Sequence, residues 1–189
     1  MERLHVAQAT IRKGKRFLHV DDTGGLSLLE LRAKARRMVQ QYGIKVAYID
    51  YLQLLHGTSK KAQGNRQVEI SEISSGLKEM AKELGIAVVV LAQLNRDLEK
   101  TKRAPRIADL RESGSLEQDA DLIGLLSNEL DEDEQPVELA GGSLKIIFDI
   151  AKQRNGPTGP CYLEFFKTFT RFFTLSRVSG EDVSTPHND

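Results

Sequence analysis

The chain has 189 residues, 40% of them hydrophobic and 29% charged, which suits one globular domain with a core of ordinary size. Its 27 basic residues balance 27 acidic ones, so a polyanion would have to be held by a local patch and not by the net charge. The single cysteine, Cys161, excludes an internal disulfide framework. Because there is no signal-like start and no apolar run of about 18 residues, we expect a cytoplasmic protein with no membrane span. We expect one domain over residues 1–178 and a frayed tail over 179–189.

The first predicted helix begins after Ser27. Ser27 is followed three residues later by Glu30, the capping-box pattern in which each side chain accepts a hydrogen bond from the other residue's backbone amide. Apolar residues then recur three and four positions apart from Leu28 to Tyr42. Gly43 is a typical C-terminal cap, so we expect the helix to end there.

A strand, a second helix and another strand follow. Residues 44–50 (IKVAYID) and 86–93 (IAVVVLAQ) are short apolar runs of the kind found in fully buried strands. Between them, apolar residues at helical spacing predict a helix from about Arg66 to Leu84, ended by Gly85. This order is typical of an α/β protein whose parallel sheet is covered on both faces and connected by right-handed crossovers.

The remaining strand-like runs lie in the C-terminal part of the chain. Residues 121–127 are predicted to form a third strand, and the acidic segment 128–142 to form a mobile surface connection. Three later runs are predicted to pair as an antiparallel meander beside the parallel core: 143–153, 161–166 and 171–176.

Two polar residues end the predicted parallel strands. Ligands of open parallel sheets bind outside the carboxyl ends of the strands, which is where Asp50 and Gln93 fall. A carboxylate there can help to position Mg²⁺, usually through water, and a neutral amide can contact a terminal phosphate or an attacking water. The alternatives are an aspartate that merely ends a strand and a glutamine that satisfies loop backbone.

Residues 109–121 (DLRESGSLEQDAD) combine features of a loop that grips a sugar-phosphate backbone. Arg111 supplies charge, Gly114 permits close approach of the backbone, and the serines can donate hydrogen bonds. The preceding loop, residues 94–106, is also basic. A compatible alternative is a capped loop-to-helix junction with Ser115 as N-cap and Gln118 three residues later.

Lys152 and Arg154 stand at the end of an apolar run, directly before the turn Asn155-Gly156-Pro157. Being two residues apart in an extended segment, they lie on the same face. On spacing alone, a solvated hairpin tip is the ordinary interpretation of such a pair.

Four blocks in order resemble the C-terminal ATPase domain of the bacterial replicative DNA helicases, the DnaB-like family. The resemblance covers most of residues 18–175 and implies a RecA-like, mostly parallel sheet flanked by helices, followed by the antiparallel meander. The blocks are IDYLQLLHG (49–57), NRQVEISEISSGLKEMAKELGIAVVVLAQLNR (65–96), DLRESGSLEQDADLI (109–123) and AKQRNGPTG (151–159).

The resemblance also implies a nucleotide site that uses ATP and Mg²⁺. It implies that Asp50 is the Walker B aspartate, which holds Mg²⁺ mainly through water, and that Gln93 links the nucleotide state to DNA. It implies that Arg154 is an arginine finger reaching the neighbouring subunit's nucleotide, with Lys152 as a second cation near the γ-phosphate. A planar guanidinium suits charge that develops over several phosphate oxygens.

For partners, the resemblance implies single-stranded DNA, whose backbone Arg111, Glu112 and Gly114 would contact, and a homo-hexameric ring with nucleotide sites between subunits. A primase and a helicase loader are further expected partners. Such contacts should go mainly to phosphates, with little base specificity and a steep dependence on salt.

The chain departs from the family in lacking a phosphate-binding loop of the form GxxxxGK[ST]. Gly14-Lys15 is followed by Arg16, and Ala9 stands where the first glycine would be. We therefore expect the P-loop strand to be missing, no ATP turnover by this chain alone, and an uncovered apolar sheet surface. The leading hypothesis is the C-terminal part of a replicative helicase motor that moves 5′ to 3′. The alternatives are a non-catalytic split or decayed module and, more weakly, another RecA-like ATPase such as a recombinase or clock-type ATPase.

Overall fold

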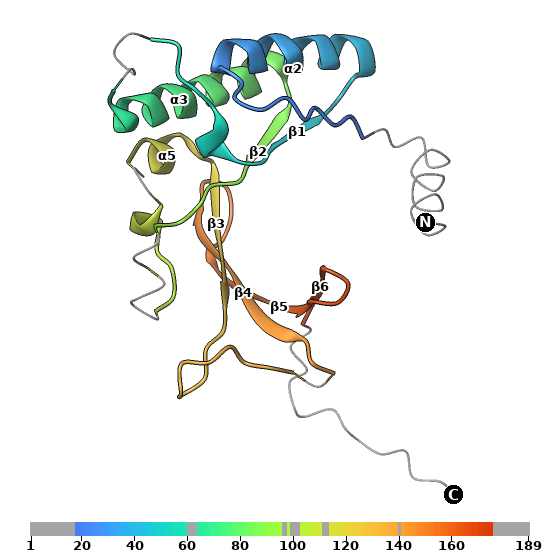
Figure 1. Cartoon of the computed structure of the whole chain (residues 1–189), viewed down its shortest axis with the longest axis vertical. Helices are drawn as coiled ribbons and strands as arrows, with labels where there is room; N and C mark the ends of the chain where they lie inside the picture. Colours follow the sequence, from blue (N-terminus) through green and yellow to red (C-terminus); the bar gives the residue numbers. More distant parts are fainter. Residues whose placement is uncertain are drawn as a thin grey trace, which may run out of the picture.

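The computed structural model describes residues 18–59, 64–95, 98, 103–110, 114–139 and 141–175. Two long helices lie side by side in it: α2 (Leu28–Tyr42) and α3 (Arg66–Leu84) (Figure 1). Both agree with the predicted boundaries. Ser27 caps α2 in a complete capping box with Glu30, and the two helices end at Gly43 and Gly85, each in the left-handed conformation that glycine adopts without strain.

The two predicted parallel strands are β1 (Val46–Ile49) and β2 (Ala87–Val90), which pair in parallel with Ile49 opposite Val90. They form a two-stranded sheet. Ile49, Val88 and Val90 face the helices and pack against the buried apolar face of α3. Members of that face are at most 5% exposed, in agreement with the helical periodicity: Ile70, Ile73, Leu77 and Met80.

Among the described residues nothing covers the opposite face of this sheet, so the prediction that both strands are fully buried is wrong for that face. Tyr48 is 73% exposed, and Val46 and Val89 are each 40% exposed. These side chains point away from α2 and α3 because neighbouring residues of a strand alternate between its two faces. Within the described residues, this side of the parallel sheet therefore presents apolar side chains to solvent.

A second, antiparallel sheet contains β3 (Leu122–Asn128), β4 (Leu144–Gln153), β5 (Gly159–Phe166) and β6 (Arg171–Thr174), in that order. The predicted meander is therefore confirmed. The predicted third strand forms its first member, pairing with β4. This sheet extends away from the helices in Figure 1. The fold is α/β, with a small parallel sheet and a C-terminal antiparallel sheet of four strands.

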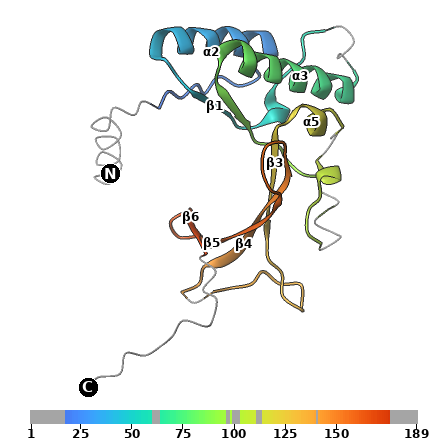
Figure 2. The same cartoon turned by 180° about the vertical axis from the view of Figure 1, so that it is seen from behind.

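Short helical segments connect these parts. They are η1 (Leu52–Leu54), η2 (Ile107–Asp109) and α5 (Gly114–Asp119). α5 packs beside α3 at one end of β3 (Figure 2). Ser115 is the second residue of α5, so the expectation that it caps the helix is wrong.

The acidic segment between β3 and β4 has regular backbone contacts. Leu130 pairs with Pro136 and Glu138 pairs with Leu144 in isolated antiparallel bridges. The Val137 amide also donates to the Glu129 carbonyl at 2.8 Å. Its described residues therefore continue the sheet hydrogen bonding beyond the ends of the strands. No helix in the described residues has the length and apolar character needed to cross a membrane.

Candidate functional site

Asp50 and the segment leading to Gln93 leave the parallel sheet at the same edge. Asp50 directly follows β1, and its backbone neighbour Ile49 accepts a hydrogen bond from the Leu91 amide at 3.0 Å. The Leu52 amide donates in turn to the Leu91 carbonyl at 2.8 Å. The two segments thus stay paired for a short distance beyond the strands, which keeps Asp50 and Gln93 on the carboxyl-end side of the sheet, as the sequence predicted.

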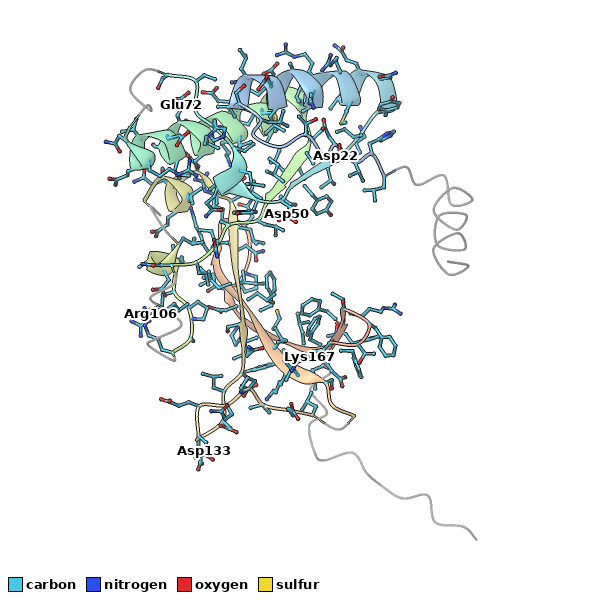
Figure 3. The ribbon with its side chains drawn as sticks, viewed as in Figure 1. Asp22, Asp50, Glu72, Arg106, Asp133 and Lys167 are labelled. Atoms are coloured by element: carbon cyan, nitrogen blue, oxygen red, sulfur yellow. The ribbon has the colours of Figure 1, made fainter. Side chains whose placement is uncertain are left out.

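A shallow, open hollow of about 360 Å³ lies at this edge, lined by Tyr51, Leu91, Ala92 and Gln93. Asp50 and Gln93 are both exposed to solvent. Figure 3 labels Asp50, which lies below the parallel sheet in that view. Asp50 directly precedes Tyr51, one of the residues that line this hollow.

The described residues contain no cluster of three or more histidine, cysteine, aspartate or glutamate side chains that could hold a metal. Asp50 would therefore contribute a single carboxylate to a Mg²⁺ ion. This donor set fits a magnesium ion that keeps most of its water ligands and binds also to phosphate oxygens. It does not fit an ion held entirely by protein side chains.

Gln53 is a site residue that sequence reasoning missed. Its Nε2 atom lies 3.4 Å from the Gln93 carbonyl oxygen, and its Oε1 atom lies 3.4 Å from the Gln93 nitrogen. The carbonyl of Gln53 accepts from Arg66 Nη2 at 3.2 Å. No local pattern could reveal this contact, because the two glutamines are 40 residues apart in sequence.

Lys152 and Arg154 lie together at a different place, the C-terminal end of α5. Lys152 Nζ donates to the Glu117 carbonyl, and Arg154 Nη2 donates to the Gln118 carbonyl at 2.7 Å. The prediction that the two cations share a face agrees with these neighbouring contacts. Within the described part of the chain, no hydrogen bond or ion pair joins them to Asp50 or Gln93.

Asp121 connects Arg154 to α3. Its Oδ1 atom lies 3.5 Å from Arg154 Nη1, and its Oδ2 atom pairs with Lys78 of α3. The hydrogen bond from Lys78 lowers the pKa of Asp121, and the charges of Arg154 and Lys152 lower it further. Sequence reasoning missed this carboxylate too, because its partners come from two distant elements.

The predicted DNA-contacting residues are only partly described. Gly114 is the first residue of α5, whereas Arg111 and Glu112 lie outside the described residues. Most cations of the basic loop 94–106 also lie outside them. Of that loop, Arg103 forms a two-point ion pair with Asp109, with N···O distances of 2.6 and 2.7 Å.

Comparison with known proteins agrees with this arrangement. The family described as the DnaB-like helicase C terminal domain matches residues 1–174. The chain is 44% identical over 170 residues to the replicative DNA helicase DnaC of Bacillus subtilis, covering 89% of this chain and 36% of that protein. It is 40% identical over 172 residues to the replicative DNA helicase DnaB of Geobacillus stearothermophilus, with the same coverage of 89% and 36%. The chain thus spans about a third of the length of these curated relatives.

Two solved structures show the same fold. One, described as a DnaB-like replicative helicase and its interactions with primase, has a TM-score of 0.71 and 37% identity, covering 84% of this chain and 38% of that one. The other, described as an ATPase domain, has a TM-score of 0.66 and 39% identity, covering 80% of this chain and 52% of that one. With a family match over nearly the whole described chain, the protein belongs to the family of DnaB-like helicase C-terminal domains.

Proposed function

We propose that this chain forms part of the ATP-driven motor of a replicative DNA helicase that moves 5′ to 3′ on single-stranded DNA in the cytoplasm. The observation that carries the proposal is the common position of Asp50 and Gln93 at the carboxyl edge of the parallel sheet, beside an open hollow. This is the edge where open α/β sheets bind their ligands. The family match over residues 1–174 supports the same function.

In this proposal, ATP and Mg²⁺ bind where the P-loop of the motor meets Asp50 and Gln93. Bound Mg²⁺ would neutralise charge on the transferred phosphate. Asp50 would accept hydrogen bonds from the water ligands of the ion and so fix its orientation. The amide of Gln93 would contact the terminal phosphate or the attacking water. Arg154, assisted by Lys152, would act on the nucleotide of a neighbouring subunit in a homo-hexameric ring.

Arg111, Glu112 and Gly114 would contact the DNA backbone, and α5, which begins at Gly114, would connect that contact to the rest of the domain. A primase and a helicase loader are the proposed protein partners. One relative of known structure is described together with its interactions with primase, which supports the first of these.

A second candidate is a non-catalytic module that binds DNA or a helicase ring without hydrolysing ATP. Unlike the first candidate, it needs no GxxxxGK[ST] loop, a motif that the sequence does not contain. The two candidates are distinguished by mixing the chain with a separately produced P-loop segment of a related helicase. Restored, DNA-stimulated ATP hydrolysis supports the motor, and its absence despite complex formation supports the module.

Arg154→Ala tests the motor further in that reconstituted helicase. Arginine fingers contribute about 10³-fold or more to turnover, so we expect a loss of that order while nucleotide binding persists. Arg171→Ala is the matched control, because Arg171 lies on β6 and its guanidinium packs 5.4 Å from the Phe173 ring. Equal turnover of the two variants would refute the assigned role of Arg154.

A further inference from the structure

Lys152 in β4 and Arg154, the residue directly after β4, close the C-terminal end of α5. Lys152 donates to the carbonyl of Glu117, and Arg154 donates to the carbonyl of Gln118 at 2.7 Å. The last carbonyls of a helix have no partner within the helix and carry partial negative charge. Lys152 and Arg154 therefore supply both the missing hydrogen bonds and the complementary charge at this helix end.

Arg154 is held in this position by Asp121. The Arg154 amide donates to the Asp121 carbonyl at 2.9 Å, and the guanidinium lies 3.5 Å from the Asp121 carboxylate. Lys78 pairs with the other oxygen of the same carboxylate. The Asp121 carboxylate thus lies between Lys78 of α3 and Arg154, the cation proposed to act on a nucleotide.

On its other side, α5 is bound to α3. Ser74 Oγ lies 2.6 Å from Asp119 Oδ2 and 3.5 Å from the carbonyl of Ser115. Ser74 is only 6% exposed, so this contact is part of the packed junction between the two helices. α5 is therefore positioned from two directions, by α3 and by the cations at the end of β4.

A helix of six residues is too short to be stable by itself, so α5 depends on these tertiary contacts. The Nη2 N–H that Arg154 donates to the Gln118 carbonyl cannot at the same time be donated to a phosphate in another subunit. A phosphate oxygen carries more charge than a carbonyl oxygen and is the stronger acceptor for a guanidinium. The same cations thus face two alternative sets of acceptors.

We propose that Lys152 and Arg154 exchange between the α5 carbonyls and the phosphates of a nucleotide in the neighbouring subunit, with Asp121 as the positioning residue that holds Arg154 on α5. This inference rests on the proposed function, because it takes Arg154 as the cation that reaches that nucleotide. When the cations leave, α5 loses its C-terminal partners. Gly114, the first residue of α5 and a proposed DNA contact, then belongs to a helix that has lost these stabilising contacts.

The intramolecular half of the proposal is tested on the full chain without nucleotide. Hydrogen exchange is measured for the wild type, Arg154→Ala, Asp121→Asn and the control Asp133→Asn. Asp133 is an exposed aspartate at the far end of the antiparallel sheet from α5 (Figure 3). We expect the Ala120 amide, which donates to the Leu116 carbonyl at 3.0 Å, to exchange faster in the first two variants only.

The amides of α3 serve as an internal reference in this experiment. They should keep the wild-type rate in every variant, which separates local release of α5 from general unfolding. If α5 exchanges at the wild-type rate in both Arg154→Ala and Asp121→Asn, the proposed contact does not support the helix and the inference is overturned.

The exchange between acceptors is tested in the helicase reconstituted with a P-loop segment. Asp121→Asn removes a competitor for Arg154, so nucleotide should bind about two- to five-fold more tightly, the range expected for loss of an exposed ion pair. DNA stimulation of turnover should fall, and Asp121→Glu should restore both properties. A variant that merely damaged the fold would bind nucleotide more weakly, and weaker or unchanged binding would overturn the inference. Undiminished turnover in Arg154→Ala would instead refute the assigned role of Arg154, on which the exchange with a nucleotide rests, and the contact with α5 measured on the chain alone would still stand.

Discussion

The side chain of Gln53 contacts both backbone groups of Gln93, with N···O distances of 3.4 Å in each direction. Gln53 lies three residues after Asp50, and Gln93 lies three residues after the end of β2. The contact therefore joins the two segments that carry the candidate nucleotide residues. The Gln53 carbonyl accepts a hydrogen bond from Arg66, the first residue of α3, and so connects the two glutamines to that helix.

Replacing Gln53 with methionine keeps the length of the side chain but removes both hydrogen bonds to Gln93. Because the two contacts are long, we expect the free energy of unfolding to fall by only about 0.5–1 kcal/mol. The Gln93 amide should exchange with solvent clearly faster. Gln67→Met is the control, since Gln67 is exposed on α3. Equal exchange of the Gln93 amide in the two variants would show that Gln53 does not position it.

Gly76 allows α3 to approach α2. A Cβ atom at this position would lie 2.3 Å from Leu28 Cδ2, and Leu28 is only 6% exposed. Alanine normally favours a helix over glycine by about 1 kcal/mol, but here the overlap should reverse the sign. We expect Gly76→Ala to lower the free energy of unfolding by about 1–3 kcal/mol in chemical denaturation.

Two comparisons decide whether the overlap is the cause. Ser75→Ala, one residue away on the exposed side of the same helix, should change stability by no more than about 0.5 kcal/mol. In a double-mutant cycle with Leu28→Ala, the added methyl at residue 76 should cost much less, since its neighbour is gone. Additive effects would contradict the steric explanation.

The ion pair between Arg103 and Asp109 makes stability depend on pH. Hydrogen bonds from the Arg103 side chain, and then from the Arg106 amide, lower the pKa of Asp109 from its ordinary value of 3.8 to about 2. A carboxyl whose pKa is lower in the folded state stabilises the fold above its unfolded pKa and loses that contribution as pH falls through the folded value. Arg106 marks this loop in Figure 3.

We therefore expect wild type and Asp109→Asn to differ most in unfolding free energy above about pH 4, with wild type more stable. The difference should shrink between about pH 4 and pH 2, as Asp109 becomes protonated. Urea denaturation across this range measures it, and carboxyl groups common to both proteins cancel in the comparison. A difference that stays constant down to pH 2 would mean that the ion pair does not set the pKa.

The uncovered face of the parallel sheet should cause the chain to self-associate. Tyr48 is 73% exposed and Val89, its register partner on β2, is 40% exposed. Exposed apolar patches beside unpaired strand edges favour association. The double variant Tyr48→Lys/Val89→Lys should raise the monomer fraction in sedimentation velocity. Leu29→Lys, at a residue 69% exposed on α2, should have little effect, and a monomeric wild type would disprove the prediction.

Local patterns predicted the individual elements well because their causes are local. The Ser27 and Glu30 capping pair and the glycines after α2 and α3 lie within a few residues of the helix ends that they determine. The apolar periodicity of α3 likewise predicted its buried face. The position of Asp50 and Gln93 at one sheet edge followed from parallel pairing alone.

The assignment of strand faces was less predictable. In a continuous apolar run such as residues 86–93, polar and apolar residues do not alternate. The sequence therefore cannot show that one face of the strand is exposed. Similarly, the strand over residues 122–128 could be recognised, but its antiparallel pairing with β4 depends on a partner that begins 16 residues after it ends.

Local patterns were enough to predict the helices and their caps, the strands, the edge that carries Asp50 and Gln93, and the family resemblance, because all of these rest on neighbouring residues or on ordered motifs. The folded chain was needed to show three side-chain contacts: Gln53 with Gln93, Lys152 and Arg154 with the end of α5, and Asp121 with both Arg154 and Lys78. The physical reason is that these contacts join residues far apart in the chain. Packing brings distant segments within hydrogen-bonding distance and so decides which acceptor a side chain finds. The spacing of residues along the chain carries no information about this.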